Sequence, residues 1–191
     1  MLLQVVNPAK KLYMNNVPCV RNLFQNVLNK VFNAVDEDRR EKLGPDRTCA
    51  EWLLRNGASV KFKGSSEFLK DYNKLPDEDF PFKIAEVEAI DSSISQYGFG
   101  NFKGCQLIWK IVFDRCYLLD NEAMKGLLVL NDSLRHLKIT NCPDITDGGL
   151  LYLKDLNLEH LEMHISPYVK DKENVFKTLK LGLPKCNIIM G

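Results

Sequence analysis

The chain has 191 residues, of which 45% are hydrophobic and 27% charged, which suits one ordinary domain or a small domain with a helical cap. A formal net charge of +1 does not indicate a nucleic acid or another polyanion as the partner. The longest apolar stretches, such as residues 127–130, are far shorter than the roughly 20 residues that cross a bilayer. We therefore expect a soluble or peripheral protein.

The N-terminal segment is basic and free of acids up to Asp36. The basic residues in it are Lys10, Lys11, Arg21 and Lys30. This composition is typical of a mitochondrial transit peptide, although the segment has a single Arg and no Ser. We predict that residues 1–20 are a transit segment. The alternative is an ordinary basic amphipathic helix, and such a segment could also hold the protein to an anionic membrane if it survives import.

Two helices are predicted in the next part of the chain. Apolar residues at steps of three and four predict a helix from Val20 to Val35, which the charged run 36–42 ends. Asp46 is the expected N-cap of a second helix that closes at residues 56–57. Residues 58–82 are polar and contain prolines, so they are expected to form a connector with one short strand at 59–62. We assign residues 21–82 to an N-terminal helical cap and connector.

The remainder of the chain, residues 83–191, contains an internal repeat. The clearest copy has its pattern residues at Leu134, Leu137, Ile139, Cys142, Ile145, Asp147, Leu150 and Leu153. The same slots, 26 residues earlier, hold Ile108, Ile111, Phe113, Cys116, Leu119, Asn121, Met124 and Leu127. Weaker copies begin at Ile84 and Leu158, and residues 183–188 resemble a closing strand. Copies in a fixed register predict a repeat architecture.

The repeated pattern is that of cysteine-containing leucine-rich repeats. Its first part predicts a short strand whose alternate residues enter the core. The small Cys suits the following turn, and Thr146 or Asp147 is the expected N-cap of a helix that packs Leu150 and Leu153 onto the strand. Such units are stable only when stacked. The predicted fold is therefore an α/β leucine-rich-repeat solenoid of about four repeats with an N-terminal helical cap.

Strand residues between the core slots are predicted to form a concave face. Their columns are Glu86, Lys110, His136 and His160; then Glu88, Val112, Lys138 and Glu162; then Ile90, Asp114, Thr140 and His164. Charges of both signs alternate there, and solenoids commonly bind partners on this face, so we predict a protein-binding surface. Its expected contact residues are Lys110, Asp114, His136, Lys138, His160 and Glu162. The alternative is a solvated face without a partner.

No motif for catalysis, a cofactor or a metal stands out. The sequence lacks a nucleophile elbow, a phosphate-binding loop and a zinc-protease motif. His136 and His160 would be neighbours, but a zinc site needs a third ligand and His164 lies too far along the strand. The six cysteines have no C-x-x-C spacing and are expected to be reduced. We predict neither an enzyme nor a small-molecule substrate.

Several motifs outside the repeats resemble a known family. They are residues 31–36, Leu43-Gly44-Pro45-Asp46-Arg47, residues 50–58 and residues 70–76, with further likeness at 89–94 and 98–99. Together with the repeats, they resemble the mitochondrial ATP synthase subunit s family, also called coupling factor B, over roughly residues 24–190. That family is related to the distal membrane-arm assembly complex protein 2 family.

The resemblance implies a non-catalytic accessory protein of mitochondrial ATP synthase. Its expected place is the matrix side of the inner membrane, peripherally attached, with membrane-sector subunits as partners and a role in coupling proton transport to ATP synthesis. The cap residues that could present a charged surface to such partners are Asp46, Arg47, Glu51 and Arg55. The alternative is that the cap only covers the end of the repeats with Trp52, Leu53 and Leu54.

One cysteine is a redox candidate. The family is associated with a neighbouring pair of thiols in the repeat that begins near Ile108. Here Cys116 matches one thiol, and Asp114 stands where the other would be, which puts dithiol chemistry in doubt. The alternative is that Cys116 is the small turn residue of its repeat.

Two other functions stay open at this point. The related family implies an assembly factor for the membrane arm of respiratory complex I, although its members usually carry a longer N-terminal part. Cysteine-containing repeats are also typical of substrate adaptors of ubiquitin ligases. The transit-like N-terminus and the lack of an F-box ahead of the repeats argue against the adaptor.

Overall fold

The structure is a computed structural model that describes residues 20–164 and 166–191, with side chains described from residue 27 onward. The predicted transit segment lies outside the described residues, except for Val20. The α-helices are α2 (Val20–Asn33), α3 (Glu37–Leu43), α4 (Pro45–Arg55), α5 (Asn121–Gly126), α6 (Asp147–Leu150) and α7 (Lys172–Gly182). The strands are β1 (Ser59–Phe62), β2 (Ile84–Ile90), β3 (Lys110–Asp114), β4 (His136–Thr140), β5 (His160–Met163) and β6 (Asn187–Met190). Short 3-10 helices are η2 (Tyr72–Lys74), η3 (Gln96–Phe102), η4 (Leu127–Leu130) and η5 (Leu151–Asp155).

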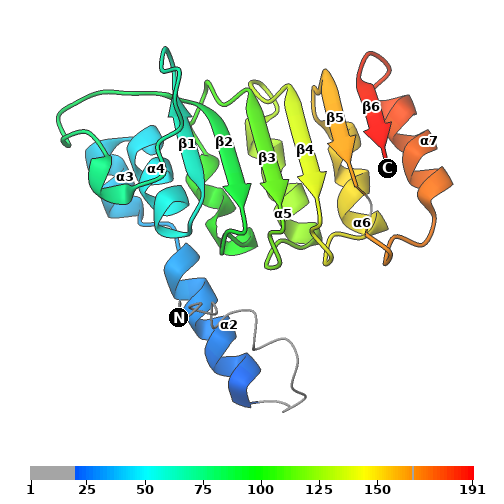
Figure 1. The fold of residues 1–191 in the computed structure, drawn as a ribbon, viewed down its shortest axis with the longest axis horizontal. Coiled ribbons are helices and arrows are strands. Elements are labelled where there is room, and N and C mark those ends of the chain that lie inside the picture. The colour runs from blue at the N-terminus through cyan, green and yellow to red at the C-terminus, as the bar shows by residue number, and fades with distance from the viewer. Residues whose placement is uncertain (1–19, 165) are drawn as a thin grey trace, which may run out of the picture.

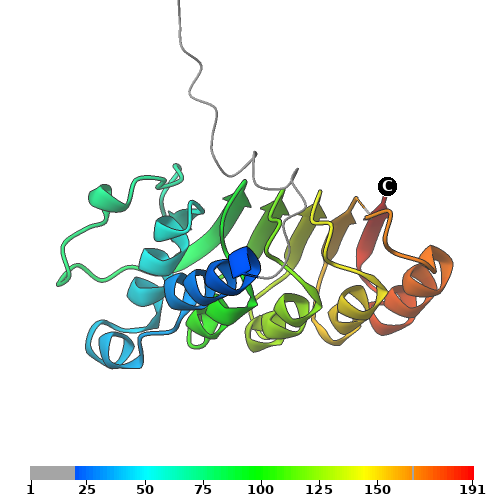
Figure 2. The same ribbon diagram turned by 90° about the horizontal axis from the view of Figure 1, so that it is seen from below.

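All six strands form one sheet, in the order β1-β2-β3-β4-β5-β6 (Figure 1). β1 is antiparallel to β2, and each later strand is parallel to the one before it. A helical segment connects each parallel strand to the next, and these segments lie along one face of the sheet (Figure 2). The predicted α/β class is confirmed. We call the face without helices the open face.

The sheet is built as the alternation in the sequence predicts. In β3, Ile111 and Phe113 are buried and their neighbours are partly exposed, and the same pattern recurs one strand further at Leu137. Alternate residues point to opposite sides of a strand, so one set enters the layer between sheet and helices. A single buried apolar cluster results, which runs from Cys49 to Ile188.

A repeated turn ends three of the strands. Asp91, Arg115 and Asn141 each have a φ of 53–54°, in the left-handed region that non-glycine residues rarely adopt. The residue after each is buried: Ser92, Cys116 and Cys142. The small residue predicted for this turn is therefore where the spacing places it. Because the turn recurs, the chain leaves β2, β3 and β4 in the same backbone conformation.

The helical segments are shorter and more varied than the repeat predicts. α5 and α6 have only six and four residues before they tighten into 3-10 helix, whereas α7 has eleven. After β2 there is no α-helix, and η3 takes its place. In η3, a Cβ on Gly98 would lie 2.3 Å from the Trp52 ring, so a residue without a side chain is needed for this contact.

The N-terminal region differs from prediction at two helix boundaries. The first helix ends at Asn33, ahead of the charged run 36–42, but that run then forms a separate helix, α3, with the Asp36 carboxylate accepting the Arg39 N–H at 2.9 Å. Asp46 is not the N-cap of α4, because Gly44 precedes the helix and Pro45 occupies its first turn. The short strand at 59–62 is confirmed as β1. In the part of the chain that the structure describes, no helix is long and apolar enough to span a membrane.

Candidate partner-binding surface

The residues predicted for the concave face lie on the open face in the predicted columns. Glu86 pairs in register with Lys110, Lys110 with His136, and His136 with His160. The next column contains Glu88, Val112, Lys138 and Glu162, and the third contains Ile90, Asp114 and Thr140. His164 follows β5 and is exposed. Six predicted contact residues are thus brought onto one continuous surface.

Ion pairs between neighbouring strands neutralise much of the charge on this surface. The Glu86 carboxylate lies 3.0 Å from Lys61 Nζ and 3.3 Å from Lys110 Nζ. Burial alone would raise the pKa of Glu86, but the two ammonium groups outweigh it and lower the pKa. Lys138 pairs with Glu162 at 2.7 Å and lowers the pKa of that carboxyl. Both carboxylates are charged at neutral pH, so a partner meets paired charges of both signs.

A row of ring side chains crosses the start of the strands. The Trp109 and His136 ring centroids are 5.0 Å apart in an edge-on arrangement, and those of His136 and His160 are 5.7 Å apart. Asn187 lies next, with its amide nitrogen 3.3 Å from His160 Nδ1. Trp109 is 39% exposed, and aromatic residues of this kind are enriched at protein interfaces. Trp109 escaped the sequence prediction because it precedes the first column by one residue.

Asp114 lies in a dense polar cluster at the far end of the strands. It accepts hydrogen bonds from Thr140 Oγ1 at 2.8 Å and Asn141 Nδ2 at 2.9 Å, and it pairs with Arg115. Arg115 also binds both oxygens of Asp91, at 2.9 and 3.0 Å. Burial opposes ionisation of Asp114, but these donors prevail and its pKa is lowered.

The four cap residues do not form one exposed surface. Asp46 is 3% exposed, and its carboxylate accepts the Ile84 N–H at 3.0 Å and pairs with Lys83 at 2.7 Å. Glu51 is 1% exposed and pairs with Arg39, Arg47 and Arg55. The Arg55 side chain is 55% exposed, whereas that of Arg47 is 11% exposed. The cap carboxylates thus hold the cap together, and Arg55 is the member of this set that a partner can reach.

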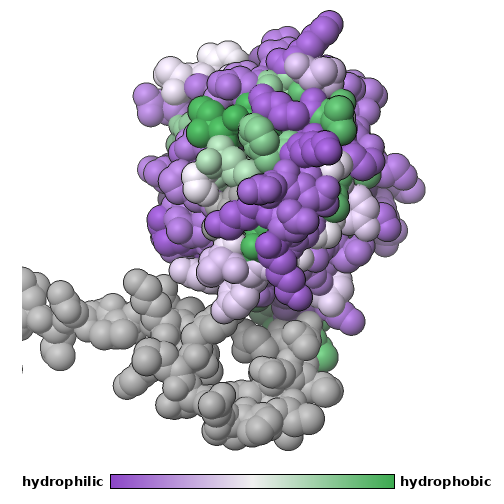
Figure 3. All heavy atoms as spheres, turned by 90° about the vertical axis from the view of Figure 1, so that its right-hand side faces the viewer, coloured by the Kyte–Doolittle hydropathy of each residue, from purple (hydrophilic) through white to green (hydrophobic). Residues whose placement is uncertain are grey.

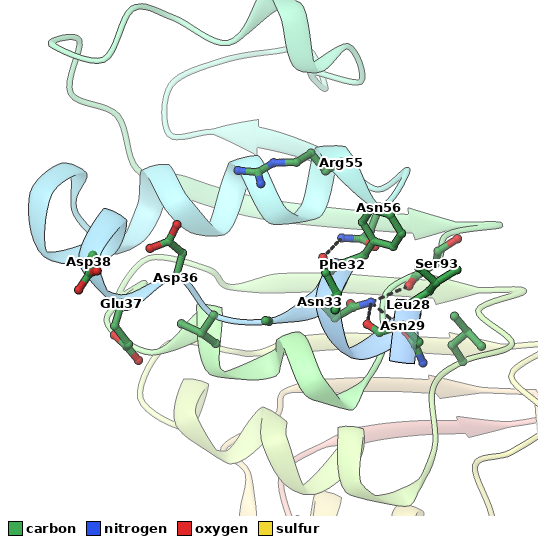
Figure 4. Close-up of a pocket in the computed structure, with 14 residues that line it drawn as sticks. Leu28, Asn29, Phe32, Asn33, Asp36, Glu37, Asp38, Arg55, Asn56 and Ser93 are labelled. Carbon is green, nitrogen blue, oxygen red and sulfur yellow. Dashed lines mark hydrogen bonds between the residues drawn. The ribbon is translucent and has the colours of Figure 1, made fainter. Parts of the chain in front are cut away.

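A cleft of about 850 Å³ lies between α2, the start of α3 and the end of α4 (Figure 4). Its walls include Leu28, Phe32 and Asp36 from the N-terminal region and Arg55 and Asn56 from α4. Within residues 20–164 and 166–191, no group of three or more His, Cys, Asp or Glu side chains could hold a metal ion.

The C-terminal end of the sheet shows a mixed surface. β6 is the edge strand there, beside α7 (Figure 1). Seen from that side, the surface is mostly hydrophilic with a smaller hydrophobic group among the charged side chains (Figure 3). Exposed apolar residues of these two elements include Leu181 and Ile189.

Known proteins resemble this chain along most of its length. A human protein named "ATP synthase subunit s, mitochondrial" is 36% identical over 175 residues, which cover 89% of this chain and 88% of the human protein. The bovine protein of that name is 37% identical over 166 residues, 84% of this chain and 83% of its own length. The rat protein is 36% identical over 175 residues, with the same coverage as the human one. No family model matches the chain.

The chain belongs to the mitochondrial ATP synthase subunit s family. The family predicted from the G-P-D-R and neighbouring motifs is thereby confirmed. The aligned 89% of the chain must include most of the N-terminal region as well as the sheet. The similarity therefore does not come from the repeats alone.

The redox candidate of this subunit s family member is buried. Cys116 is 0% exposed, and its Sγ lies 3.1 Å from the Ala89 carbonyl oxygen and 3.2 Å from Ser92 Oγ. A hydrogen bond with Cys142, together with Ser92, lowers the pKa of Cys116 to about 7, against the opposing effect of burial. The neighbouring Cys142 thiol has a raised pKa, because it shares that hydrogen bond and is buried. Asp114, two residues before Cys116, accepts the hydrogen bonds from Thr140 and Asn141 described above.

Proposed function

We propose that this protein is a non-catalytic accessory protein of mitochondrial ATP synthase. Identity of 36% across 89% of the chain with proteins named as subunit s of that enzyme carries the proposal. We place the protein on the matrix side of the inner membrane, peripherally attached. Its partners would be membrane-sector subunits, and its role would be to support coupling of proton transport to ATP synthesis.

We further infer that the parallel strands and their helical segments are cysteine-containing leucine-rich repeats. The spacing of 24–26 residues between strand columns supports this inference, as do the left-handed turns before Cys116 and Cys142. Repeat proteins of this kind present a sheet face to their partners. The open face, with its cross-strand ion pairs and the Trp109 row, is the surface we propose for the synthase partner.

Native co-migration from solubilised mitochondria tests the proposal. The tagged wild-type protein is expected to migrate with the ATP synthase. Lys138→Glu should lower its recovery there by about tenfold, because it places two carboxylates side by side on the open face. The double variant Lys138→Glu with Glu162→Lys keeps an ion pair between the two strands but exchanges the positions of the two charges. Lost co-migration of this variant would therefore indicate lost partner recognition and not a folding defect. Lys172→Glu is the matched control, because Lys172 is exposed on α7, and it should leave recovery unchanged.

The other outcomes contradict the proposal in different ways. Migration only with membrane-arm intermediates of respiratory complex I would replace it with an assembly factor. Recovery in the cytosol with a ubiquitin ligase scaffold would exclude a mitochondrial function. If both Lys138 variants co-migrate as the wild type does, the partner does not bind on this part of the open face.

A further inference from the structure

Helix α2 packs against the rest of the protein with its polar side. Asn33, on that side, is 1% exposed. Its Oδ1 accepts hydrogen bonds from Trp52 Nε1 and from the Ser95 N–H, both at 3.0 Å, and its Nδ2 donates to the Ser93 carbonyl at 3.3 Å. Asn29, one turn earlier, accepts from the same Nδ2 at 3.0 Å. The asparagine stripe of α2 is thus the side that attaches the helix.

Most of the described apolar side of α2 is exposed, although Leu28 is half-buried at the cleft. Val27 is 51% exposed, Val31 64% and Phe32 67%. A helix on a globular protein ordinarily buries its apolar stripe and exposes its polar one, so α2 is inverted. The sequence continues the apolar spacing toward the start of the helix at Val20, Leu23 and Phe24. Figure 1 shows α2 leading away from the sheet and the other helices, so most of its length stands clear of them.

The charges near the apolar face are cationic. With 3.6 residues per turn, Lys30 falls at one border of the apolar arc, where it is exposed and its Nζ lies 5.1 Å from the Tyr97 ring centroid. The sequence of α2 contains one further cation, Arg21. The helix has no acidic residue, and none precedes it in the chain. The carboxylates that line the adjoining cleft are those of Asp36, Glu37 and Asp38, beyond the end of α2. Figure 4 shows them at the α3 end of the cleft, apart from Leu28 and Asn29.

We propose that α2 lies on the surface of an anionic phospholipid membrane, with Val27, Val31 and Phe32 entering the boundary between headgroups and acyl chains. An exposed apolar face on a helix that contains Lys and Arg but no acidic residue is what such an interface binds, through apolar burial and attraction to anionic headgroups. A neutral protein groove would also bury these apolar side chains, but the net positive charge of α2 favours an anionic surface.

This inference names the segment that would make the proposed peripheral attachment. It rests on the proposed function, which supplies the inner membrane as the anionic surface. The contact would orient the protein, because α2 is fixed to α4 and η3 through Asn33. The open face would then keep a fixed relation to the membrane plane, within reach of a membrane-embedded partner. Membrane docking and partner recognition would occupy separate parts of the molecule.

Co-sedimentation of the purified full chain with vesicles tests the proposal. One set of vesicles contains about four parts phosphatidylcholine to one part cardiolipin, and the other phosphatidylcholine alone. The wild-type protein is expected to bind the anionic vesicles at least about tenfold more strongly, and added salt should weaken that binding. Val31→Gln with Phe32→Gln should lower it by about tenfold, since Gln suits a helix but removes the apolar contact. Leu181→Gln is the matched control, since Leu181 is 75% exposed on α7, and it should change nothing.

Three results would overturn the inference. One is a wild-type protein that stays in the supernatant with both kinds of vesicle. Another is equal binding to neutral and anionic vesicles, and the third is undiminished binding by the double Gln variant. The proposed function fails separately, because a protein that binds vesicles but migrates with no synthase refutes the accessory role and leaves the lipid contact standing.

Discussion

A carboxylate withdrawn from water keeps its charge only where cations or hydrogen-bond donors replace the solvent. Glu51 meets this condition with three guanidinium groups: Arg39 Nε at 2.7 Å, Arg55 Nη2 at 2.9 Å and Arg47 Nε at 3.2 Å. Burial raises its pKa, but hydrogen bonds from Arg39 and Arg47 outweigh this and lower the pKa below its ordinary value of 4.5. This one side chain thus joins α3, which contains Arg39, to α4, which contains the other two arginines and Glu51 itself.

Glu51→Gln should therefore destabilise the protein strongly. The amide keeps the shape but leaves three arginines without their shared anion, and removing one partner of a buried pair costs about 3 kcal/mol or more. Urea unfolding followed by circular dichroism measures the loss. Glu78→Gln is the control, because Glu78 is 48% exposed and pairs with Arg39 alone, so its loss should cost under about 1 kcal/mol. Equal losses for the two variants would contradict a central role for Glu51.

Cys116 should react slowly with thiol reagents in the folded protein. Its lowered pKa favours the reactive thiolate, but a reagent must also reach the sulfur, which is fully buried. Labelling with iodoacetamide, read by peptide mass, is expected to be at least about a hundredfold slower in buffer than in urea. Labelling of native Cys116 as fast as in urea would restore its redox role.

The sequence identifies these residues but does not predict their exposure. Asp46 and Glu51 stand on a short charged helix, where solvated side chains are the ordinary expectation. Their burial depends on partners remote in the chain, such as the Ile84 N–H for Asp46 and Arg39 for Glu51. Such pairings follow from tertiary packing, which no local pattern encodes.

Among the elements, the strands were the most predictable and the helices the least. Apolar residues at a fixed period set the strand register, so columns such as Glu86, Lys110 and His136 follow from spacing alone. The helical segments are short, and a few residues of 3-10 geometry leave no periodic signal. The inverted packing of α2 was equally hidden, because its apolar stripe would ordinarily be assigned to the core.

The junction of α5 and α6 offers a sharp test of how closely the units pack. A Cβ on Gly149 would lie 2.4 Å from Asn121 Oδ1 and 2.9 Å from Asn121 Cα, so Gly149→Ala must push α5 away. We expect a loss of about 1–3 kcal/mol in the free energy of unfolding, measured in urea.

The adjacent glycine provides the control for this prediction. A Cβ on Gly148 would meet only the Asn121 side-chain amide, at 3.5 Å, which is ordinary contact. Because Ala favours a helix over Gly, Gly148→Ala should be neutral or stabilising by up to about 1 kcal/mol. If Gly149→Ala is as harmless as Gly148→Ala, the two units are not packed as closely as the structure indicates.

At the scale of the whole molecule, carboxylates with lowered pKa are distributed from the cap to β5. Glu51 lies in the cap, Glu86 in β2, Asp114 at the end of β3 and Glu162 in β5. Each is ionised and paired or hydrogen-bonded in the folded protein, and each is more easily protonated in the unfolded chain. No single region therefore carries the response to acid. Since the buried apolar cluster is continuous, weakening one unit affects its neighbours.

The sign of the pH dependence follows from these shifts. A carboxyl whose pKa is lower in the folded state contributes stability that is complete above its ordinary value and disappears as pH falls through the folded value. With ordinary values of 4.5 for Glu and 3.8 for Asp, stability should be flat near neutral pH and fall steadily below about pH 4.5. Urea midpoints across acidic pH measure this fall. The stability of the Glu51→Gln variant should be lower at neutral pH and should fall less steeply with acidification, because one titrating group is gone. A wild-type protein whose stability rises on acidification would show that burial, and not the arginines and lysines, governs these carboxyls.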